Sequence, residues 1–268
     1  MEYRNRVAFI TGGASGIGLG IADALASRGC HIVLADIQAD ALSAAEQALN
    51  QYDCTILPLH LDVANREQVY AAAGRVAARF PHIDLLFNNA GIGDAGSPLP
   101  TMNDNFFDWI MKVNVTGCMN VLKACIPLIQ RSASGGHIVN TASMAALVVT
   151  PGWNQGLYSA TKMAVLALSL DLRDALASEG IGVSTLCPGL VSTNIAETAL
   201  KLRPKQAGSH VPDVPDMLKA SGMSPAEAAL ITLDGIDRNL PIIVTHPELW
   251  PEVERFHQVI KDAFFVEC

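Results

Sequence analysis

A glycine-rich turn between an apolar strand and a helix is the feature that most constrains the fold of this chain. Residues 6–11 predict a buried strand, and apolar residues at helical spacing follow from Ile17 onward. Between them lies Gly12-Gly-Ala-Ser-Gly16-Ile-Gly18. Glycines let the backbone approach a pyrophosphate, and a helix N-terminus offers free N–H groups and a positive dipole end. The segment therefore predicts a phosphate cradle; the alternative is a tight turn whose glycines serve only packing.

The second predicted strand, residues 30–36, ends in a carboxylate that is suited to bind a ribose. Asp36 lies roughly twenty residues beyond the glycine turn, the spacing expected for such an acid. A carboxylate accepts hydrogen bonds from the 2′- and 3′-hydroxyls and repels a 2′-phosphate. No Arg or Lys stands at residues 13–15 or 37–38. These observations favour NAD and disfavour NADP; the alternative is a solvated acid at a strand end.

A tyrosine and a lysine four residues apart form the candidate catalytic pair. Tyr158 and Lys162 fall in a helix predicted at 155–178, where residues four apart share one face. Free tyrosine has a pKa near ~10, and a nearby cation lowers that pKa by favouring the phenolate. Such a pair also occurs by chance in many helices, so it acquires meaning only beside a cofactor site.

The chain is organised as alternating strands and helices with no obvious linker. Its 268 residues fit one α/β domain, which we expect to span residues 1–268. Strands are predicted at 6–11, 30–36, 55–62, 83–87, 136–143, 181–187 and 242–245. Helices are predicted from Ile17 onward, after Asn65, and at 38–51, 103–131, 155–178, 224–239 and 247–266.

Composition excludes several classes of function. A formal net charge of −8 argues against nucleic-acid binding, which needs clustered Lys and Arg. The cysteines are scattered, without a CxxC pair or zinc spacing, so no metal is expected. We find neither a signal-peptide pattern nor a membrane-length apolar run, and we expect a cytoplasmic protein that does not bind membranes. Charged residues are only 16% of the chain, so partner subunits are expected to cover part of its surface.

Four motifs together resemble those of the short-chain dehydrogenase/reductase family. They are the Thr-Gly-x-x-x-Gly-x-Gly motif from Thr11 to Gly18, Asn-Asn-Ala-Gly at 88–91, Tyr-x-x-x-Lys at 158–162, and Pro-Gly-x-x-x-Thr at 188–193. The resemblance implies a single-domain Rossmann-type fold of the α/β class, a doubly wound parallel sheet of about seven strands with helices on both faces. It also implies hydride transfer between NAD and a secondary alcohol or ketone.

The resemblance assigns roles to residues that match the motifs. Tyr158 is the expected acid and base, Lys162 lowers its pKa, Ser143 binds the substrate oxygen, and Asn114 holds a relay water. The expected cofactor contacts are Gly12, Ser15, Gly16, Ile17, Gly18, Asp36, Asp62, Val63, Asn89, Ala90, Gly91, Tyr158, Lys162, Pro188, Gly189, Val191 and Thr193. Because all four of the expected catalytic residues Asn114, Ser143, Tyr158 and Lys162 are present, we favour an enzyme over the alternative, a catalytically silent NAD-binding sensor or scaffold.

Two segments predict what kind of substrate the protein binds. The loop between Ser143 and Tyr158 contains Met144, Val149 and Trp153, and a lid is expected over residues 192–223, starting near Asn194. They predict a bulky hydrophobic or aromatic substrate. A local similarity of residues 192–197 and 202–204 to bacterial Cα-dehydrogenases of lignin-derived aryl ethers agrees with this; hydroxysteroids and sugar alcohols remain alternatives.

Subunit contacts are expected from the family and from one terminal helix. Family members dimerise through the tyrosine helix, whose second face here comprises Thr161, Val165, Leu168 and Leu172; burial within one chain is the alternative. The helix predicted at 247–266 has an apolar face that would cover the pocket or reach another subunit. We therefore expect a homodimer or a homotetramer.

Overall fold

A seven-stranded parallel sheet forms the centre of the computed structural model, which describes residues 2–94, 98–133, 135–207 and 222–265. The strand order is β3-β2-β1-β4-β5-β6-β7. The strands are β1 Val7–Thr11, β2 His31–Asp36, β3 Ile56–His60, β4 Leu85–Asn88, β5 Gly136–Thr141, β6 Ile181–Cys187 and β7 Ile242–Val244. This confirms the predicted doubly wound α/β sheet.

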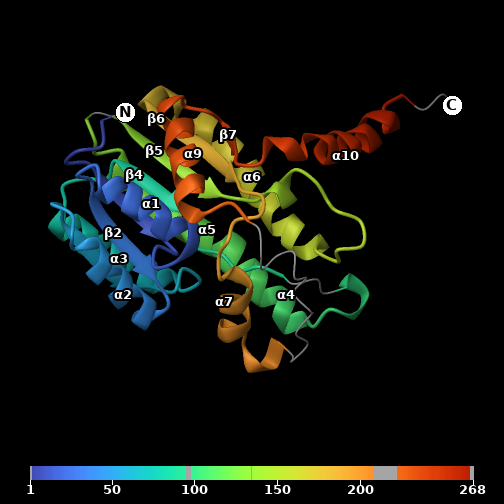
Figure 1. Ribbon diagram of the computed structural model, residues 1–268, viewed down its shortest axis with the longest axis horizontal. Helices are drawn as coiled ribbons and strands as arrows, with labels where there is room; N and C mark the ends of the chain where they lie inside the picture. Colours follow the sequence, from blue (N-terminus) through green and yellow to red (C-terminus); the bar gives the residue numbers. More distant parts are fainter. Residues whose placement is uncertain (1, 95–97, 134, 208–221, 266–268) are drawn as a thin grey trace.

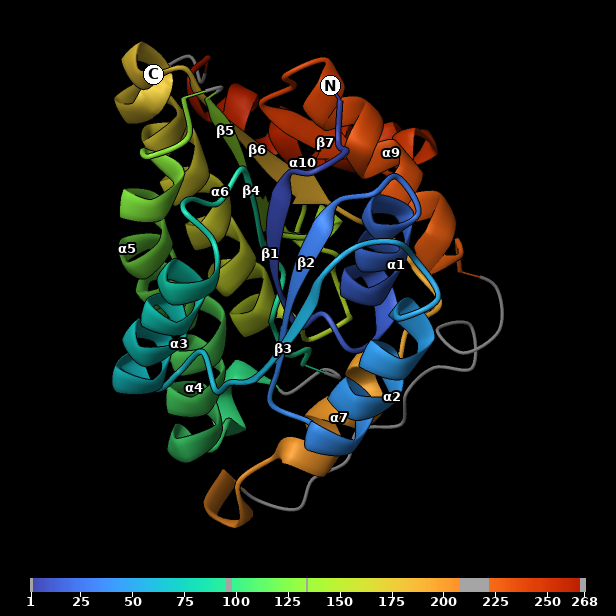
Figure 2. The ribbon, with the colours of Figure 1, turned by 90° about the vertical axis from the view of Figure 1, so that its left-hand side faces the viewer.

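Helices cover both faces of the sheet, as Figure 2 shows. One layer holds α3 Arg66–Arg79, α5 Cys118–Ile129 and α6 Gly156–Leu176; the other holds α1 Gly16–Ala26, α2 Ala39–Leu49 and α9 Pro225–Asp237. Consecutive residues of a strand point to opposite faces, so Phe9 packs in the first layer and Ile10 in the second. Both are fully buried. The strands are apolar on both sides because both faces are covered.

The direction of the crossover connections determines where a crevice forms along the sheet. Thr11 at the end of β1 pairs in register with Ala35 of β2 on one side and with Asn88 of β4 on the other. The chain winds outward from β1 in both directions, so the loops after β1 and β4 separate and leave a crevice at the carboxyl ends of the strands. The glycine turn and the Asn-Asn-Ala-Gly motif meet there.

The helix predicted at 103–131 is interrupted in its middle. It consists of α4 Asp104–Met111, a π-helical segment Lys112–Gly117 and α5 Cys118–Ile129, with Pro127 inside α5. A π-segment widens the helix locally and is frequent at functional sites. Here it places Asn114 at 2% exposure, where its side chain reaches other elements.

The carboxyl-terminal third adds the last strand and several short helices. It contains α7 Ile195–Leu202 and the one-turn helix Lys205–Ala207, then, after α9 and β7, the turn Pro247–Leu249 and α10 Trp250–Ala263. Part of the lid expected at 192–223, residues 208–221, lies outside the described residues. No helix in the described part of the chain has the length and apolarity needed to cross a membrane.

The second face of α6 differs from the subunit contact expected of it. Thr161 and Val165 are buried within the chain itself, so the expectation is wrong for these two residues. The Thr161 hydroxyl donates to the Tyr158 carbonyl (2.8 Å) and accepts from the Asn114 amide (3.1 Å). Leu168 and Leu172 are half-buried. In the first turns of α6, this face therefore packs inside the protomer.

Candidate active site

Hydrogen bonds with the loop after β4 fix the conformation of the glycine turn after β1. The Thr11 hydroxyl accepts from the backbone N–H groups of Asn89 (3.0 Å) and Ala90 (3.1 Å), while the Asn89 amide donates to the carbonyls of Thr11 and Gly12 (both 3.2 Å). Gly12 has φ +62°, and a Cβ there would lie 2.9 Å from Ala90 Cα. A Cβ on Gly18 would collide with the Gly12 carbonyl oxygen. The glycines are thus required by the close approach of these backbones, which leaves the N-terminus of α1 facing the crevice.

Asp36 lies at the end of the crevice nearest β2. Its carboxylate is 6% exposed and accepts from the backbone N–H groups of Ala14 (3.1 Å) and Gln38 (3.0 Å). A carboxylate has about four acceptor sites, so two remain for a ligand's hydroxyls. Asp62 lies on the next strand's loop, where its carboxylate accepts from Ala64 N–H (2.9 Å). This end of the crevice is acidic and has no basic side chain at 37–38.

Asn114 joins the loop after β4 to the tyrosine helix. Its side-chain oxygen accepts from Ile92 N–H (2.9 Å), and its amide donates to the Ile92 carbonyl (3.0 Å) and the Thr161 hydroxyl (3.1 Å). The side chain therefore fixes the backbone beside Gly91. Both amide hydrogens are engaged, so a relay water at Asn114 would have to donate to one of its oxygen atoms.

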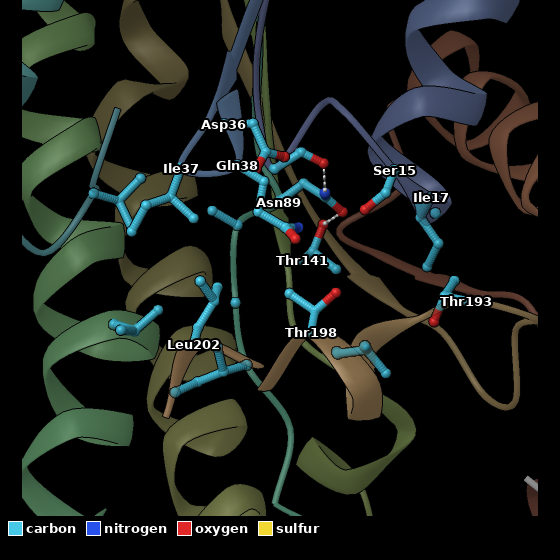
Figure 3. Close-up of a pocket in the computed structure, with 18 of the residues that line it drawn as sticks. Ser15, Ile17, Asp36, Ile37, Gln38, Asn89, Thr141, Thr193, Thr198 and Leu202 are labelled. Atoms are coloured by element: carbon cyan, nitrogen blue, oxygen red, sulfur yellow. Dashed lines mark hydrogen bonds between the residues drawn. The ribbon is translucent and has the colours of Figure 1, made fainter. Parts of the chain in front are cut away.

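Tyr158 and Lys162 reach the same part of the crevice from α6. The Lys162 ammonium donates to the Thr141 carbonyl (3.0 Å) and lies 5.7 Å from the centre of the Tyr158 ring. Lys162 is 4% exposed and Tyr158 is half-buried. The Thr141 hydroxyl donates to the Asn89 side-chain oxygen (3.2 Å), so the lysine is positioned through the same residues that hold the glycine turn (Figure 3).

Burial is the main cause of the pKa shifts of Tyr158 and Lys162. Burial raises the pKa of the Tyr158 phenol, while a side-chain hydrogen bond with Ser143 acts in the opposite direction. Burial also lowers the pKa of Lys162 to about 8. The expectation that Lys162 lowers the pKa of Tyr158 is therefore not met by the chain alone. The low-polarity surroundings disfavour both charged forms, and the ammonium is directed at the Thr141 carbonyl.

Ser143 and the loop after β6 form the wall behind Tyr158. Ser143 Oγ accepts from Ala145 N–H (3.1 Å), which shapes the turn Met144–Ala146, and Met144 N–H donates to the Pro188 carbonyl (2.9 Å). Gly189 N–H donates to the Thr245 hydroxyl (3.1 Å). A Cβ on Gly189 would overlap His246, so this histidine packs against the loop.

One cavity of about 290 Å³ brings most of the predicted residues together. Those that line it are Gly12, Ser15, Gly16, Ile17, Asp36, Asp62, Val63, Asn89, Ala90, Gly91, Tyr158, Lys162, Pro188, Thr193 and Asn194. Other predicted residues lie outside this lining: Gly18, Asn114, Ser143, Gly189 and Val191. Of the predicted substrate contacts, Met144 is buried in the core, and Val149 (38%) and Trp153 (46%) are exposed.

Several lining residues were not predicted from the sequence. They include Gln38, Ile92, Trp109, Lys112, Thr141, Thr198 and Leu202. Figure 3 shows Thr198 and Leu202 of α7 facing the cavity across from Asp36. These two residues are four apart, so helical periodicity could have placed them on one face of a helix within the lid expected at 192–223. Thr141 could have been found as a polar residue at a strand end.

The arrangement suits an elongated ligand with distinct chemistry along its length. Hydroxyl groups would fit beside Asp36, phosphates beside the N-terminus of α1, and a reacting group beside Tyr158 and Lys162. A phenol and an ammonium at the inner end can move a proton to or from an oxygen atom.

Comparisons with known proteins agree with this geometry. The family model described as short chain dehydrogenase matches residues 6–203. A C alpha-dehydrogenase of Sphingobium sp. strain SYK-6 is 34% identical over 270 residues, covering 98% of this chain and 87% of that protein. The 3beta-hydroxysteroid dehydrogenase 2 of Eggerthella lenta is 35% identical over 190 residues, covering 71% and 72%. A short chain dehydrogenase/reductase from Burkholderia phymatum, solved in complex with NAD, superposes with a TM-score of 0.90 at 32% identity over 97% of this chain and 96% of that one.

Proposed function

The chain belongs to the short-chain dehydrogenase family, and on that basis we propose that it is an NAD-dependent oxidoreductase that interconverts a bulky, apolar secondary alcohol and its ketone. One observation carries the proposal. The Tyr158 and Lys162 side chains line the same cavity as the glycine turn and Asp36.

The residues of the cavity fit a nicotinamide dinucleotide. Gly12, Ser15 and Gly16 line the cavity at the N-terminus of α1, where the backbone can receive a pyrophosphate. Asp36 retains acceptor sites for the adenosine ribose hydroxyls and would repel a 2′-phosphate. Val63, Asn89, Ala90, Pro188 and Thr193 supply the remaining walls. NAD is accordingly the proposed cofactor, and the related structure solved with NAD supports this choice.

The side chains of this protein would handle the proton while the bound nicotinamide supplies hydride acceptance and donation. In oxidation, the Tyr158 phenolate takes the hydroxyl proton of the alcohol as the C–H bond gives up its hydride. In reduction, the Tyr158 phenol donates that proton to the carbonyl oxygen. Ser143 donates a hydrogen bond to the same oxygen and stabilises the charge that develops on it. With the cofactor bound, the Lys162 ammonium would bind its ribose hydroxyls and stabilise the phenolate by charge, and Asn114 would hold the relay water.

An apolar substrate is favoured by the apolar side chains of the cavity and of the loop that leads to Tyr158. Ile92, Trp109, Ile195 and Leu202 line the cavity, and the loop exposes Val149 and Trp153. Two relatives act, by their names, on a Cα position and on a 3β-hydroxysteroid. An aryl carbinol is the first choice for this chain, and a hydroxysteroid is the second.

The test is formation of the reduced cofactor, NADH or NADPH, with a matched panel of secondary alcohols. The panel contains an aryl carbinol with a second aryl ether group, a 3β-hydroxysteroid, a sugar alcohol and acetoin, each with NAD and with NADP. We expect kcat/KM to be highest for the aryl carbinol and at least tenfold higher with NAD than with NADP. Preference for the sugar alcohol or for NADP would contradict the proposal. NAD binding without turnover of any alcohol would favour a silent sensor.

A further inference from the structure

The loop after β6 is fixed by a residue at the end of β7, the strand beside β6 at the edge of the sheet (Figure 1). Cys187, the last residue of β6, pairs in register with Val244 of β7. Just beyond this pair, Gly189 N–H donates to the Thr245 hydroxyl (3.1 Å). Thr245 is 2% exposed, so water does not compete for this bond. The turn Pro188-Gly189 is therefore held by a residue that does not itself line the cavity.

His246 contacts the same hydroxyl through its imidazole. Thr245 Oγ1 lies 2.6 Å from His246 Nδ1. The hydroxyl oxygen already accepts from Gly189 N–H, and a hydroxyl has one hydrogen of its own to donate. Within the part of the chain that the structure describes, Nδ1 is the acceptor available to that hydrogen. A buried O–H is thus satisfied when Nδ1 is unprotonated and the imidazole carries its proton on Nε2.

The imidazole also packs directly against Gly189. A Cβ built on Gly189 would lie 2.6 Å from His246 Cγ, 2.7 Å from Nδ1 and 3.0 Å from Cβ. The close approach of the ring to the backbone therefore requires a glycine at this position. Thr245 and His246 contact the same residue of the loop, one by a hydrogen bond and the other by packing. Together they restrict both the orientation and the position of the Gly189 peptide.

This turn lies at the end of the cavity that holds the candidate catalytic residues. Pro188 lines the cavity, and its carbonyl accepts from Met144 N–H (2.9 Å), next to Ser143. Asp36 follows β2, which is separated from β6 by β1, β4 and β5 in the sheet. A dinucleotide whose adenosine ribose reaches Asp36 would therefore present its nicotinamide to the turn after β6.

We propose that Thr245 and His246 are positioning residues for the nicotinamide half of the cofactor and act through the Gly189 peptide. The inference rests on the NAD-dependent function proposed above and adds two residues to it. Neither side chain lines the cavity, so neither would touch the cofactor. Loss of either contact should loosen the Pro188-Gly189 turn and weaken binding of the nicotinamide, while binding of the adenosine and the pyrophosphate stays unchanged.

The first experiment removes the threonine hydroxyl and compares two ligands. Thr245→Val keeps the shape of the side chain, Thr245→Ser restores the hydroxyl, and the control Thr232→Val removes another buried hydroxyl from α9. Each variant is titrated calorimetrically with NAD and with ADP-ribose, which lacks the nicotinamide. We expect Thr245→Val to raise the dissociation constant for NAD by about five- to tenfold and that for ADP-ribose by less than about twofold. Thr245→Ser and Thr232→Val should bind both ligands as the wild type does.

The comparison of ligands separates positioning from general damage. An unchanged affinity of Thr245→Val for NAD would overturn the inference. Equal weakening of NAD and ADP-ribose would overturn it as well, because the substitution would then disturb the whole cavity. A wild-type protein that binds neither ligand would instead reject the proposed cofactor, and this inference with it.

The second experiment tests the acceptor on the imidazole. The His246 atoms nearest to Gly189 are Cβ, Cγ and Nδ1. Asparagine can keep an acceptor at the third of these positions, whereas leucine places a methyl group there. We expect His246→Leu to lose NAD affinity selectively, as Thr245→Val does, and His246→Asn to keep most of the wild-type affinity. Because His246 is only half-buried, this pair also decides the question if Thr245→Val does not fold. Equal NAD affinities of His246→Leu and His246→Asn would show that the histidine contributes packing alone and that its positioning role is wrong.

Discussion

At the scale of single residues, the site depends on a lysine that is costly to bury. Lys162 is 4% exposed, and burial lowers its pKa to about 8. Its ammonium has the Thr141 carbonyl as an acceptor and the Tyr158 ring 5.7 Å away. The unfolded chain has no such penalty, so keeping this ammonium in the core reduces stability. A side chain kept at that cost is typical of functional sites.

Lys162→Met should stabilise the protein while it abolishes activity. The folded pKa lies below the unfolded one, so the penalty is complete below about pH 8 and disappears as the pH approaches the unfolded value of about 10.5. We expect the variant to gain about 1–3 kcal/mol in free energy of unfolding at pH 7, and the gain to shrink between pH 8 and pH 10. Urea unfolding at these pH values measures it.

The control for this comparison is Lys123→Met, which removes the same charge from an exposed position on α5. It should change stability little at any of these pH values. A Lys162→Met variant less stable than the wild type at pH 7 would mean that the ammonium is not penalised by its surroundings.

At the scale of elements, α7 closes one side of the cavity and is held in place by Arg203, the residue directly after it. The Arg203 guanidinium lies 4.3 Å above the Phe106 ring of α4, and its Nε and Nη2 donate to the Ala207 carbonyl (3.1 and 2.7 Å). Thr198 and Leu202 of the same helix line the cavity. Arg203 thus acts through α7 as a positioning residue.

Arg203→Ala should weaken cofactor binding without removing the chemistry. Loss of the ring contact and of the bonds to Ala207 is worth about 1–2 kcal/mol, so the dissociation constant for NAD should rise roughly 5- to 30-fold. Fluorescence titration with NAD measures the change. Lys201→Ala removes a neighbouring charge from the exposed face of the same helix and should have little effect. Equal losses in both variants would indicate a general charge effect in place of the α7 contact.

The sequence predicted the positions of the strands and helices well, but it did not predict where a helix is interrupted. The strands were placed to within a few residues because buried parallel strands have short apolar runs with polar ends. The π-segment at Asn114 was not predicted, since it is stabilised by bonds to Ile92 and Thr161, far away along the chain. The position of α7 across the cavity was not predictable either, because it depends on the contact between Arg203 and Phe106.

At the scale of the whole molecule, the parallel sheet brings the predicted motifs to one edge. Thr11 lies beside Asn88, and Thr141 of the next strand bonds both Asn89 and Lys162. Three of the sequence motifs follow strands and the fourth opens α6, and together they identified many of the residues that line the cavity. They could not reveal that burial outweighs the Ser143 hydrogen bond in setting the pKa of Tyr158, because that balance depends on packing from several elements.

The outermost helix illustrates the same limit. The apolar stripe of α10 has the pattern of any helix that covers a core, so the sequence alone left open whether it would cover the pocket or reach another subunit. In the structure the stripe is buried only at its first turns. Whether a helix packs on its own core or projects from it depends on the whole fold, which the pattern of one segment does not contain.

The central claim is that Tyr158 transfers the proton, and Tyr158→Phe tests it most directly. Phenylalanine keeps the ring next to Lys162 and removes only the hydroxyl. We expect the folded variant to bind NAD with a dissociation constant within about threefold of the wild type, measured by titration, and its kcat on the best alcohol to fall by at least about 100-fold. Near wild-type turnover in a folded, NAD-binding Tyr158→Phe variant would contradict the account.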